Sequence, residues 1–390
     1  MLFIIAVTSA RKVFLTKSER YSQESRILLV EVKTFEVSPN IASSRYRHFR
    51  ALDEHRLRLG KSIWGPVDSP LRCHRGFTGR LHNSAPVGCG GKTSQSDWLQ
   101  TIRHYPAPWA ELATESIIFT VPSESVRTIE NPAVLLSFWD KAMRAICKLA
   151  ATPAPLQRKE RIIADVQISA GWMHAGYPIM CHLGSVKEML DLEHIKAKGT
   201  WGLTHELGHN QQRSGWDFHP HTSEATCNLW AVYVHEEVLG IPRHKAHNDL
   251  QPKQRVKKIE QYVRNGAKLE EWKIWTCLET YLQLQEGFGW KPFIQLFSDY
   301  QKMTKISKDN SDKMNLWAKL FSEQVKRNLA PFFQAWGWPI TDKVSQELSS
   351  FPEWKENPMK EWKENPVKEY MPAQLCARKI ESDTGTCRRE

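Results

Sequence analysis

The chain lacks any run of apolar residues long enough to cross a membrane as a helix. Such a helix needs about 20 apolar residues, whereas the apolar opening at residues 2–7 is short and has no basic residue before it. A secretory signal starts with a basic segment and has a longer apolar core. We therefore expect residues 2–7 to form a buried strand or an unstructured start.

Closely spaced cysteine pairs are also missing. None of the eight cysteines forms a Cys-x-x-Cys unit, and an even count in a chain of 390 residues is weak evidence for disulfides. Cys147, Cys227 and Cys277 fall in helical apolar patterns, where a free thiol behaves as a small hydrophobic residue. This usage predicts a reducing, cytoplasmic setting.

Acidic residues are scarce at the start of the chain. Most of the formal charge of +11 falls in residues 1–92, but the Lys and Arg residues there are scattered rather than clustered. We interpret residues 1–92 as a basic, poorly defined N-terminal segment with one predicted strand at residues 27–32. The scatter argues against nucleic acid as a partner.

The most informative motif is His-Glu-x-x-His at His205, Glu206 and His209. On a helix, residues four apart share one face, so both imidazoles can reach one metal ion while Glu206 points to the neighbouring side. The alternative is an exposed helix that carries two incidental histidines. The spacing favours a zinc site in which Glu206 serves as the catalytic general base.

Catalytic zinc usually takes three protein ligands and leaves a fourth position for water. Glu224 is the best candidate for the third ligand, because it lies near the start of a second helical pattern after a turn-rich connector. Two antiparallel helices would place Glu224 opposite His205 and His209. Asn228, one turn later, could orient a ligand from behind.

A donor to the transition state is harder to identify from the sequence. The nearby candidates share only their proximity along the chain and are more typical of structural or exposed positions: His219, His221, Tyr233 and His235. Zinc binding and peptide hydrolysis are therefore separate hypotheses.

Secondary structure before the motif alternates between helix and strand. The patterns predict helices at residues 98–109, 131–150 and 186–198 and strands at residues 116–121 and 161–168. Pro178 cannot donate to a strand ladder, so residues 176–180 are predicted to be an edge strand. That strand could form one wall of a substrate cleft or simply close the sheet.

After the motif the chain is predicted to be helical throughout. Apolar residues recur at helical spacing at residues 255–263, 272–286, 291–303, 314–329 and 331–336. Residues 353–360 are repeated almost unchanged at 361–368, a unit too short for a stacking repeat fold. We interpret residues 353–390 as a flexible tail with this duplicated unit.

Five long runs, at residues 164–183, 205–216, 221–243, 279–293 and 331–340, resemble the C-terminal domain of the TRP channel-associated factors. That domain is similar to the enhancin-like zinc metallopeptidases, whose wider members attack mucin glycoproteins. The likeness spans about residues 93–359. It implies an α+β, zincin-like (gluzincin-type) domain at residues 93–352, with a small mixed sheet before the zinc helix and an all-α C-terminal lobe.

The resemblance also implies a site and a role. It assigns His205, His209 and Glu224 as zinc ligands and Glu206 as the catalytic base. Channel-associated factors bind a TRP cation channel of the melastatin class and regulate its delivery to the plasma membrane and its gating. A cytoplasmic location at the inner face of that membrane, with membrane contact only through the channel, follows from the same resemblance.

Two features depart from the family. Its members carry a long region before this domain to which residues 1–92 show no likeness, and the duplicated tail is also unlike the family. Contacts with the channel that are made by that region would be absent. The leading hypothesis is thus a zinc-binding trafficking factor for the channel; the alternative is an active metallopeptidase that hydrolyses protein or glycoprotein substrates.

Overall fold

The computed structural model describes residues 13–16, 31–34, 87–89 and 93–360, and the chain divides into two compact units, Met1–His74 and Arg75–Glu390. In the first unit, strands β1 (Val13–Thr16) and β2 (Glu31–Thr34) pair in antiparallel fashion. The strand predicted at residues 27–32 overlaps β2 only at its end. Its other residues, and the opening run at residues 2–7, lie outside the described residues.

The second unit begins with a six-stranded mixed sheet in the order β3-β4-β5-β6-β8-β7. The parallel pairs are β3 with β4, β5 with β6 and β6 with β8; the other two pairs are antiparallel. The strands are β3 (Val87–Cys89), β4 (Trp109–Ala113), β5 (Ile117–Pro122), β6 (Glu160–Asp165), β7 (Met173–His174) and β8 (Ile179–His182). A small mixed sheet before the His-Glu-x-x-His helix was predicted, and the structure contains it.

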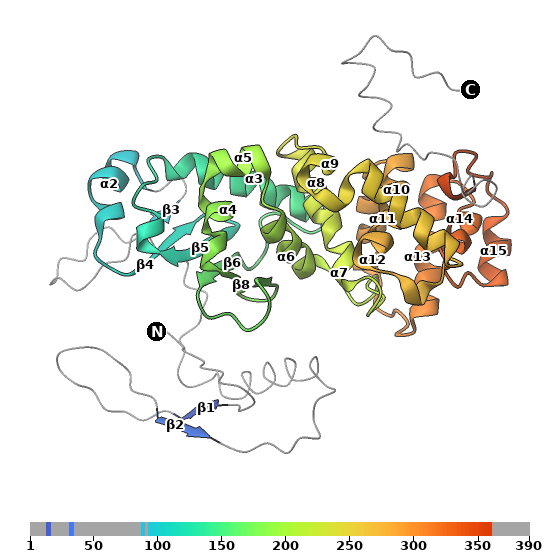
Figure 1. Ribbon diagram of the computed structural model, residues 1–390, viewed down its shortest axis with the longest axis horizontal. Coiled ribbons are helices and arrows are strands. Elements are labelled where there is room, and N and C mark those ends of the chain that lie inside the picture. The colour runs from blue at the N-terminus through green and yellow to red at the C-terminus, as the bar shows by residue number, and fades with distance from the viewer. Residues whose placement is uncertain (1–12, 17–30, 35–86, 90–92, 361–390) are drawn as a thin grey trace, which may run out of the picture. The chain divides into compact units, whose positions relative to one another are not determined.

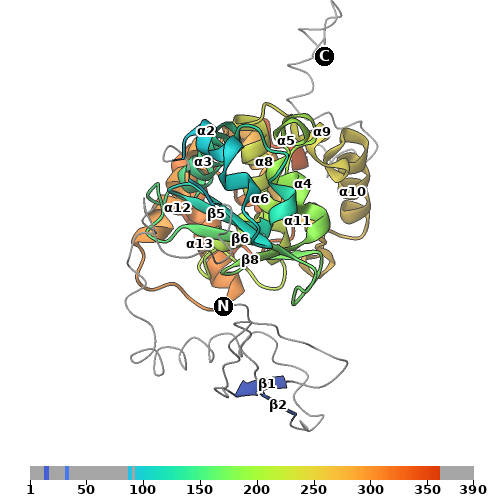
Figure 2. The same cartoon turned by 90° about the vertical axis from the view of Figure 1, so that its left-hand side faces the viewer.

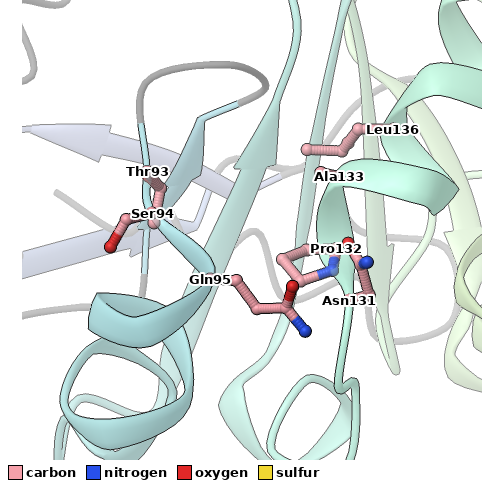
Figure 3. Close-up of a pocket in the computed structure, with 7 residues that line it drawn as sticks. All are labelled: Thr93, Ser94, Gln95, Asn131, Pro132, Ala133 and Leu136. Atoms are coloured by element: carbon pink, nitrogen blue, oxygen red, sulfur yellow. The ribbon is translucent and has the colours of Figure 1, made fainter.

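One long amphipathic helix, α3 (Pro132–Ala150), packs on this sheet. Asn131 caps it by accepting a hydrogen bond from the backbone N–H of Val134. Its buried face includes Trp139, whose ring meets Phe119 of β5 at a centroid distance of 5.0 Å. Figure 2 shows α3 and the helix that carries the His-Glu-x-x-His motif, α6 (Trp201–Gln211), on the same side of the strands.

Two helices predicted before the motif differ from the observed ones. The helix predicted at residues 98–109 is instead α2 (Gln95–Gln100), a short 3-10 turn and then β4, because Pro106 and Pro108 interrupt the helical pattern and the chain turns into the sheet. The helix predicted at residues 186–198 is split into α4 (Val186–Leu190) and α5 (Leu192–Lys198). The side chain of Asp191 starts α5 by accepting a hydrogen bond from the N–H of His194.

The prediction of an edge strand at residues 176–180 was wrong. Only residues 179–182 form a strand, β8, and β8 lies inside the sheet between β6 and β7. The edge is the two-residue strand β7. Pro178 precedes β8, where its missing N–H leaves the ladder intact.

The C-terminal lobe is helical, as predicted (Figure 1). Its helices enclose buried aromatic side chains. Trp317 stacks on Phe321 with ring centroids 4.9 Å apart. The helix predicted at residues 314–329 begins earlier, at the Asp309 cap, and ends before Lys326, whose φ is 54°. The helices are α9 (Arg243–Ala246), α10 (Pro252–Arg264), α11 (Ile274–Phe288), α12 (Lys291–Lys302), α13 (Asn310–Val325), α14 (Ala330–Ala335) and α15 (Asp342–Leu348).

The first copy of the duplicated unit belongs to this lobe and not to a flexible tail. The ring of Trp354 is buried against Phe288 and Phe332. Gly287 makes room for it, because a Cβ at that position would lie 2.6 Å from the indole. Residues 353–360 therefore do not belong to the flexible tail that was predicted to start at residue 353, and the second copy of the unit lies outside the described residues.

Buried ion pairs connect several helices of the lobe. The guanidinium of Arg255 donates to Glu279 and Glu286, and Arg243 donates to Glu236 and Glu286. All four hydrogen bonds are 2.7–3.0 Å long, and both Arg side chains are only 4% exposed. No described helix is both long and apolar enough to span a membrane.

We predict that Arg255→Ala destabilises the fold by about 3–5 kcal/mol, because it leaves the buried carboxylate of Glu279 without its cation. Urea denaturation of the full chain measures this change. The matched control is Lys196→Ala, which breaks an exposed pair with Glu193 and should change the free energy of unfolding by less than about 1 kcal/mol. Equal losses in the two variants would contradict the prediction.

Candidate metal centre

Helix α6 presents both histidines of the motif on one face. His205 and His209 are four residues apart, and their Nε2 atoms lie 3.1 Å from each other. Glu206, between them, faces a neighbouring side of the helix and is 7% exposed. This is the arrangement that the spacing predicts.

A second helical segment, α7 (Ser223–Thr226) followed by α8 (Asn228–Glu237), packs against α6 in antiparallel fashion. Contacts run from Thr200 with His235 at one end to His209 with Glu224 at the other. Gly208 permits this close approach, because a Cβ there would lie 2.3 Å from the carbonyl oxygen of Cys227. Oε2 of Glu224 consequently lies 3.5 Å from Nε2 of His205 and 3.3 Å from Nε2 of His209.

These separations suit a tetrahedral metal ion. Ligands held about 2.0–2.1 Å from a tetrahedral zinc ion are about 3.3 Å apart. The three distances among the Nε2 atoms and the Glu224 oxygen are 3.1, 3.3 and 3.5 Å. Two histidine nitrogens and one carboxylate oxygen also form a donor set that zinc commonly takes.

Each histidine is oriented by a carboxamide. Nδ1 of His205 lies 2.7 Å from Oδ1 of Asn228, and Nδ1 of His209 lies 2.8 Å from Oε1 of Gln212. When Nδ1 donates to the amide oxygen, Nε2 keeps a free lone pair that points at the site. The predicted position of Asn228 behind a histidine is therefore what the structure shows.

The same two carboxamides hold the segment that carries Glu224. Asn228 donates through Nδ2 to the backbone oxygen of Glu224 at 3.0 Å, and Gln212 donates to the backbone oxygen of Ser223 at 2.7 Å. The indole of Trp201 also donates to Asn228 at 3.1 Å. Sequence reasoning missed Gln212 and Trp201, although Gln212 follows His209 by three residues and so lies one helical turn further along.

Cys227 lies within the same group but does not complete the donor set. His205, His209, Glu224 and Cys227 place one potential ligand atom each within 4.8 Å of one another. The sulfur of Cys227 lies 3.5 Å from Nδ1 and 3.7 Å from Nε2 of His205. Because it is nearly equidistant from both nitrogens, it does not lie along the Nε2 lone pair, and burial raises the pKa of this thiol well above its ordinary value.

Electrostatics in the site follow from burial and proximity. Burial raises the pKa of Glu206, while His205 and His209 oppose the shift. Hydrogen bonds from His205 and His209 lower the pKa of Glu224. Burial lowers the pKa of His209, but the hydrogen bonds to Glu224 and Gln212 outweigh it and leave the pKa raised.

The four candidates for the transition-state donor differ in their surroundings. His235 is fully buried, with Nδ1 2.7 Å from the backbone oxygen of Ala231 and Nε2 accepting from the N–H of Thr200. Tyr233 is buried against Trp290, and His219 lies beside the hydroxyl of Ser223. His221 is not part of the potential metal-ligating group.

Residues 83–337 match the family "Peptidase M60, enhancin and enhancin-like", and the chain belongs to that family. Its fold is thus that of the M60 metallopeptidases, with a mixed sheet and many helices. Among curated proteins, the chain is 61% identical over 276 residues to a TRPM8 channel-associated factor homolog of Xenopus laevis, covering 71% of this chain and 30% of that protein. It is 58% identical over 276 residues to human TRPM8 channel-associated factor 2, with the same shares covered.

The chain therefore spans about a third of the length of these relatives. Solved structures share its fold at lower identity. A functionally unknown conserved protein from Bacillus anthracis superposes with a TM-score of 0.63 at 22% identity, covering 73% of this chain and 62% of that one. The ZmpB metallopeptidase from Clostridium perfringens gives a TM-score of 0.55 at 16% identity, covering 70% of this chain and 57% of that one.

We predict that Gly208→Ala separates α6 from α8 and costs about 1–3 kcal/mol, because the new methyl group meets backbone atoms of Cys227. Metal affinity should fall with it. Gly202→Ala on the same helix is the matched control, since its methyl group would meet the flexible end of Met173 closely and Glu188 at an ordinary contact distance, and no backbone atom of another segment. Thermal unfolding and zinc titration of both variants test this, and equal effects would contradict it.

Proposed function

We propose that this chain holds a zinc ion with His205, His209 and Glu224 in a zincin-like, gluzincin-type domain. The support is geometric: three donor atoms lie 3.1–3.5 Å apart, and carboxamides fix the Nδ1 atoms of both histidines. Zinc in such a site polarises a substrate carbonyl and makes water a better nucleophile near neutral pH. A domain with this zinc site would be able to carry out metal-assisted chemistry, whether or not that chemistry is its function.

The proposed role of the protein is that of a factor associated with a melastatin-class TRP cation channel. The main support for this role is that the domain is 55–61% identical to proteins named TRPM8 channel-associated factors. In this role the chain binds the channel at the cytoplasmic face of the plasma membrane and regulates its delivery and gating. The domain supplies the binding surface, and zinc holds α6 and the α7–α8 segment together.

The second candidate function is hydrolysis of peptide bonds in a protein or glycoprotein, and the placement of Glu206 favours it. Its carboxylate is buried beside the two histidines, and burial raises its pKa, which suits a group that accepts and returns a proton. Glu206 would take a proton from the attacking water and deliver it to the leaving amine. An adaptor that only holds zinc needs no carboxylate at this position.

For the zinc site we predict about one equivalent of zinc in the purified full chain and in Glu206→Gln, and none in His209→Ala. If the protein is a peptidase, Glu206→Gln lowers turnover of casein or a mucin glycopeptide at least about 100-fold, because only the base is removed. Metal analysis and product mass spectrometry measure these quantities.

The outcomes separate the two functions. Zinc without cleavage by the wild-type chain removes the peptidase and leaves the adaptor. Wild-type cleavage that persists in Glu206→Gln contradicts the role of Glu206, and an absence of zinc in the wild-type chain rejects the site.

For the channel role we predict that co-expression of the full chain raises the surface fraction of TRPM8, and that the two proteins co-precipitate. Glu206→Gln should act like the wild type if binding alone is needed, since it keeps the zinc and the fold. Surface biotinylation measures the effect, and His209→Ala tests whether zinc is required. A chain that neither co-precipitates nor changes the surface fraction contradicts the role.

A further inference from the structure

The connection between β6 and β8 differs in composition from the rest of the domain. Residues 166–178 contain no Asp, Glu, Lys or Arg, although these make up 25% of the chain. Of the five large apolar side chains that are exposed within residues 93–360, three lie here: Val166, Trp172 and Tyr177, at 63%, 56% and 43%. Large exposed apolar side chains concentrated in one uncharged loop indicate a contact surface rather than a solvated loop.

The loop lies beside the proposed catalytic base. Helix α6 presents Gly202, Glu206 and Asn210 on one stripe, each four residues after the last. A Cβ at Gly202 would meet Met173 at 2.7 Å, and the side chain of Asn210 bonds to both the N–H and the carbonyl of Gly176. Because Gly202 and Asn210 both lie against residues 166–178, Glu206 between them faces the same loop. His174 of that loop interacts electrostatically with the carboxyl group of Glu206.

The exposed rings are held firmly in place. The ring of Trp172 packs on the ring of His182, with centroids 4.5 Å apart. Gly184 lies directly beside the Trp172 indole, because a Cβ at Gly184 would be 2.7 Å from it. The guanidinium of Arg158 lies 3.7 Å from the ring centroid of Tyr177. Rigid, exposed aromatic rings lose little entropy when a ligand packs on them, which is why such residues dominate contact energies.

Edge strand β7 runs through this loop. The carbonyl of Trp172 accepts from the N–H of His182, so the backbone groups of Met173, the next residue, face away from β8 toward the open edge. An extended peptide can pair with such an edge by strand addition. Its side chains would then lie over Trp172 or Tyr177.

We propose that residues 166–177 form the specificity wall of the site and select an extended peptide that presents an apolar or aromatic side chain beside the metal. This inference deepens the proposed peptidase or peptide-binding function and rests on it. Residues 166–177 themselves contain no Asp, Glu, Lys or Arg with which to pair an acidic or basic side chain, and the guanidinium of Arg158 beside them is stacked on the ring of Tyr177. Burial of an apolar or aromatic side chain of the peptide against the exposed rings would stabilise the complex, whereas burial of an unpaired charged side chain there would destabilise it.

The test uses zinc-loaded full chain carrying Glu206→Gln, so that peptides bind without being cut. Three fluorescent peptides are identical except for a central phenylalanine, glutamate or lysine, and fluorescence anisotropy measures the dissociation constants. The phenylalanine peptide should bind at least about tenfold more tightly than the other two. Added Trp172→Ala or Tyr177→Ala should remove most of that preference.

Matched controls are Val134→Ala and Ile274→Ala, which truncate exposed apolar side chains on α3 and α11. They should leave the preference unchanged, and equal zinc content in all variants shows that the fold is kept. Equal affinity for the three peptides, or loss of the preference in the controls, overturns the inference. Tighter binding of a peptide bearing a sugar, lost in Trp172→Ala, also overturns it.

Failure of the specificity wall and failure of the proposed peptidase function give different results. A preference for phenylalanine in a chain whose wild type cleaves nothing supports the wall and leaves the protein as a peptide-binding adaptor. Cleavage by the wild type without side-chain preference supports the peptidase and rejects the wall.

Discussion

The contact between Gly208 and the backbone of Cys227 is the constraint on which the site depends. A hydrogen atom in place of a side chain lets α6 lie directly on the segment that follows. At that distance the carboxylate of Glu224 reaches both imidazoles, the carboxamide of Asn228 reaches His205 from behind, and Gln212 reaches the backbone oxygen of Ser223. Any larger spacing would break all of these contacts together.

The rest of the domain holds this contact from outside. Glu236, near the end of α8, bonds to Arg243, which in turn bonds to Glu286 of α11. The connector before α7 is tied to α13 by Lys313, whose ammonium donates to the backbone oxygen of Asp217 at 3.0 Å. The helical lobe therefore fixes both the beginning and the end of the segment that carries Glu224, and the aromatic core supports the lobe.

The sequence predicts the parts of this arrangement that are local. His205 and His209 share a helix face because of their spacing alone, and α3 and most lobe helices follow from apolar periodicity. Glu224 could be proposed because the connector is short and a helical pattern resumes after it. The hydrogen bond from Gln212 to the backbone oxygen of Ser223 and the proximity of Cys227 depend on how closely α6 approaches the next helical segment. The sequence does not disclose this distance, because it depends on one glycine among 20.

Sheet order was less predictable for a related reason. Whether β8 is an edge or an interior strand depends on β7, which has only two residues and leaves no periodic pattern. Trp354 was also misjudged from the sequence. The duplicated unit that contains it suggested a flexible tail, but its indole fills the space left by Gly287. In both cases a contact distant in sequence decides the outcome.

The carboxamides behind the histidines also set the charge of the site. Many zinc-bound histidines donate to a carboxylate, which adds negative charge behind the metal. Here Asn228 and Gln212 are neutral. With zinc bound, Glu224 would be the one charged ligand, and its single negative charge would face the two positive charges of the ion. The carboxylate of Glu206 beside the histidines would offset the remaining positive charge, so the net charge of the site would change from neutral to positive when Glu206 takes up a proton.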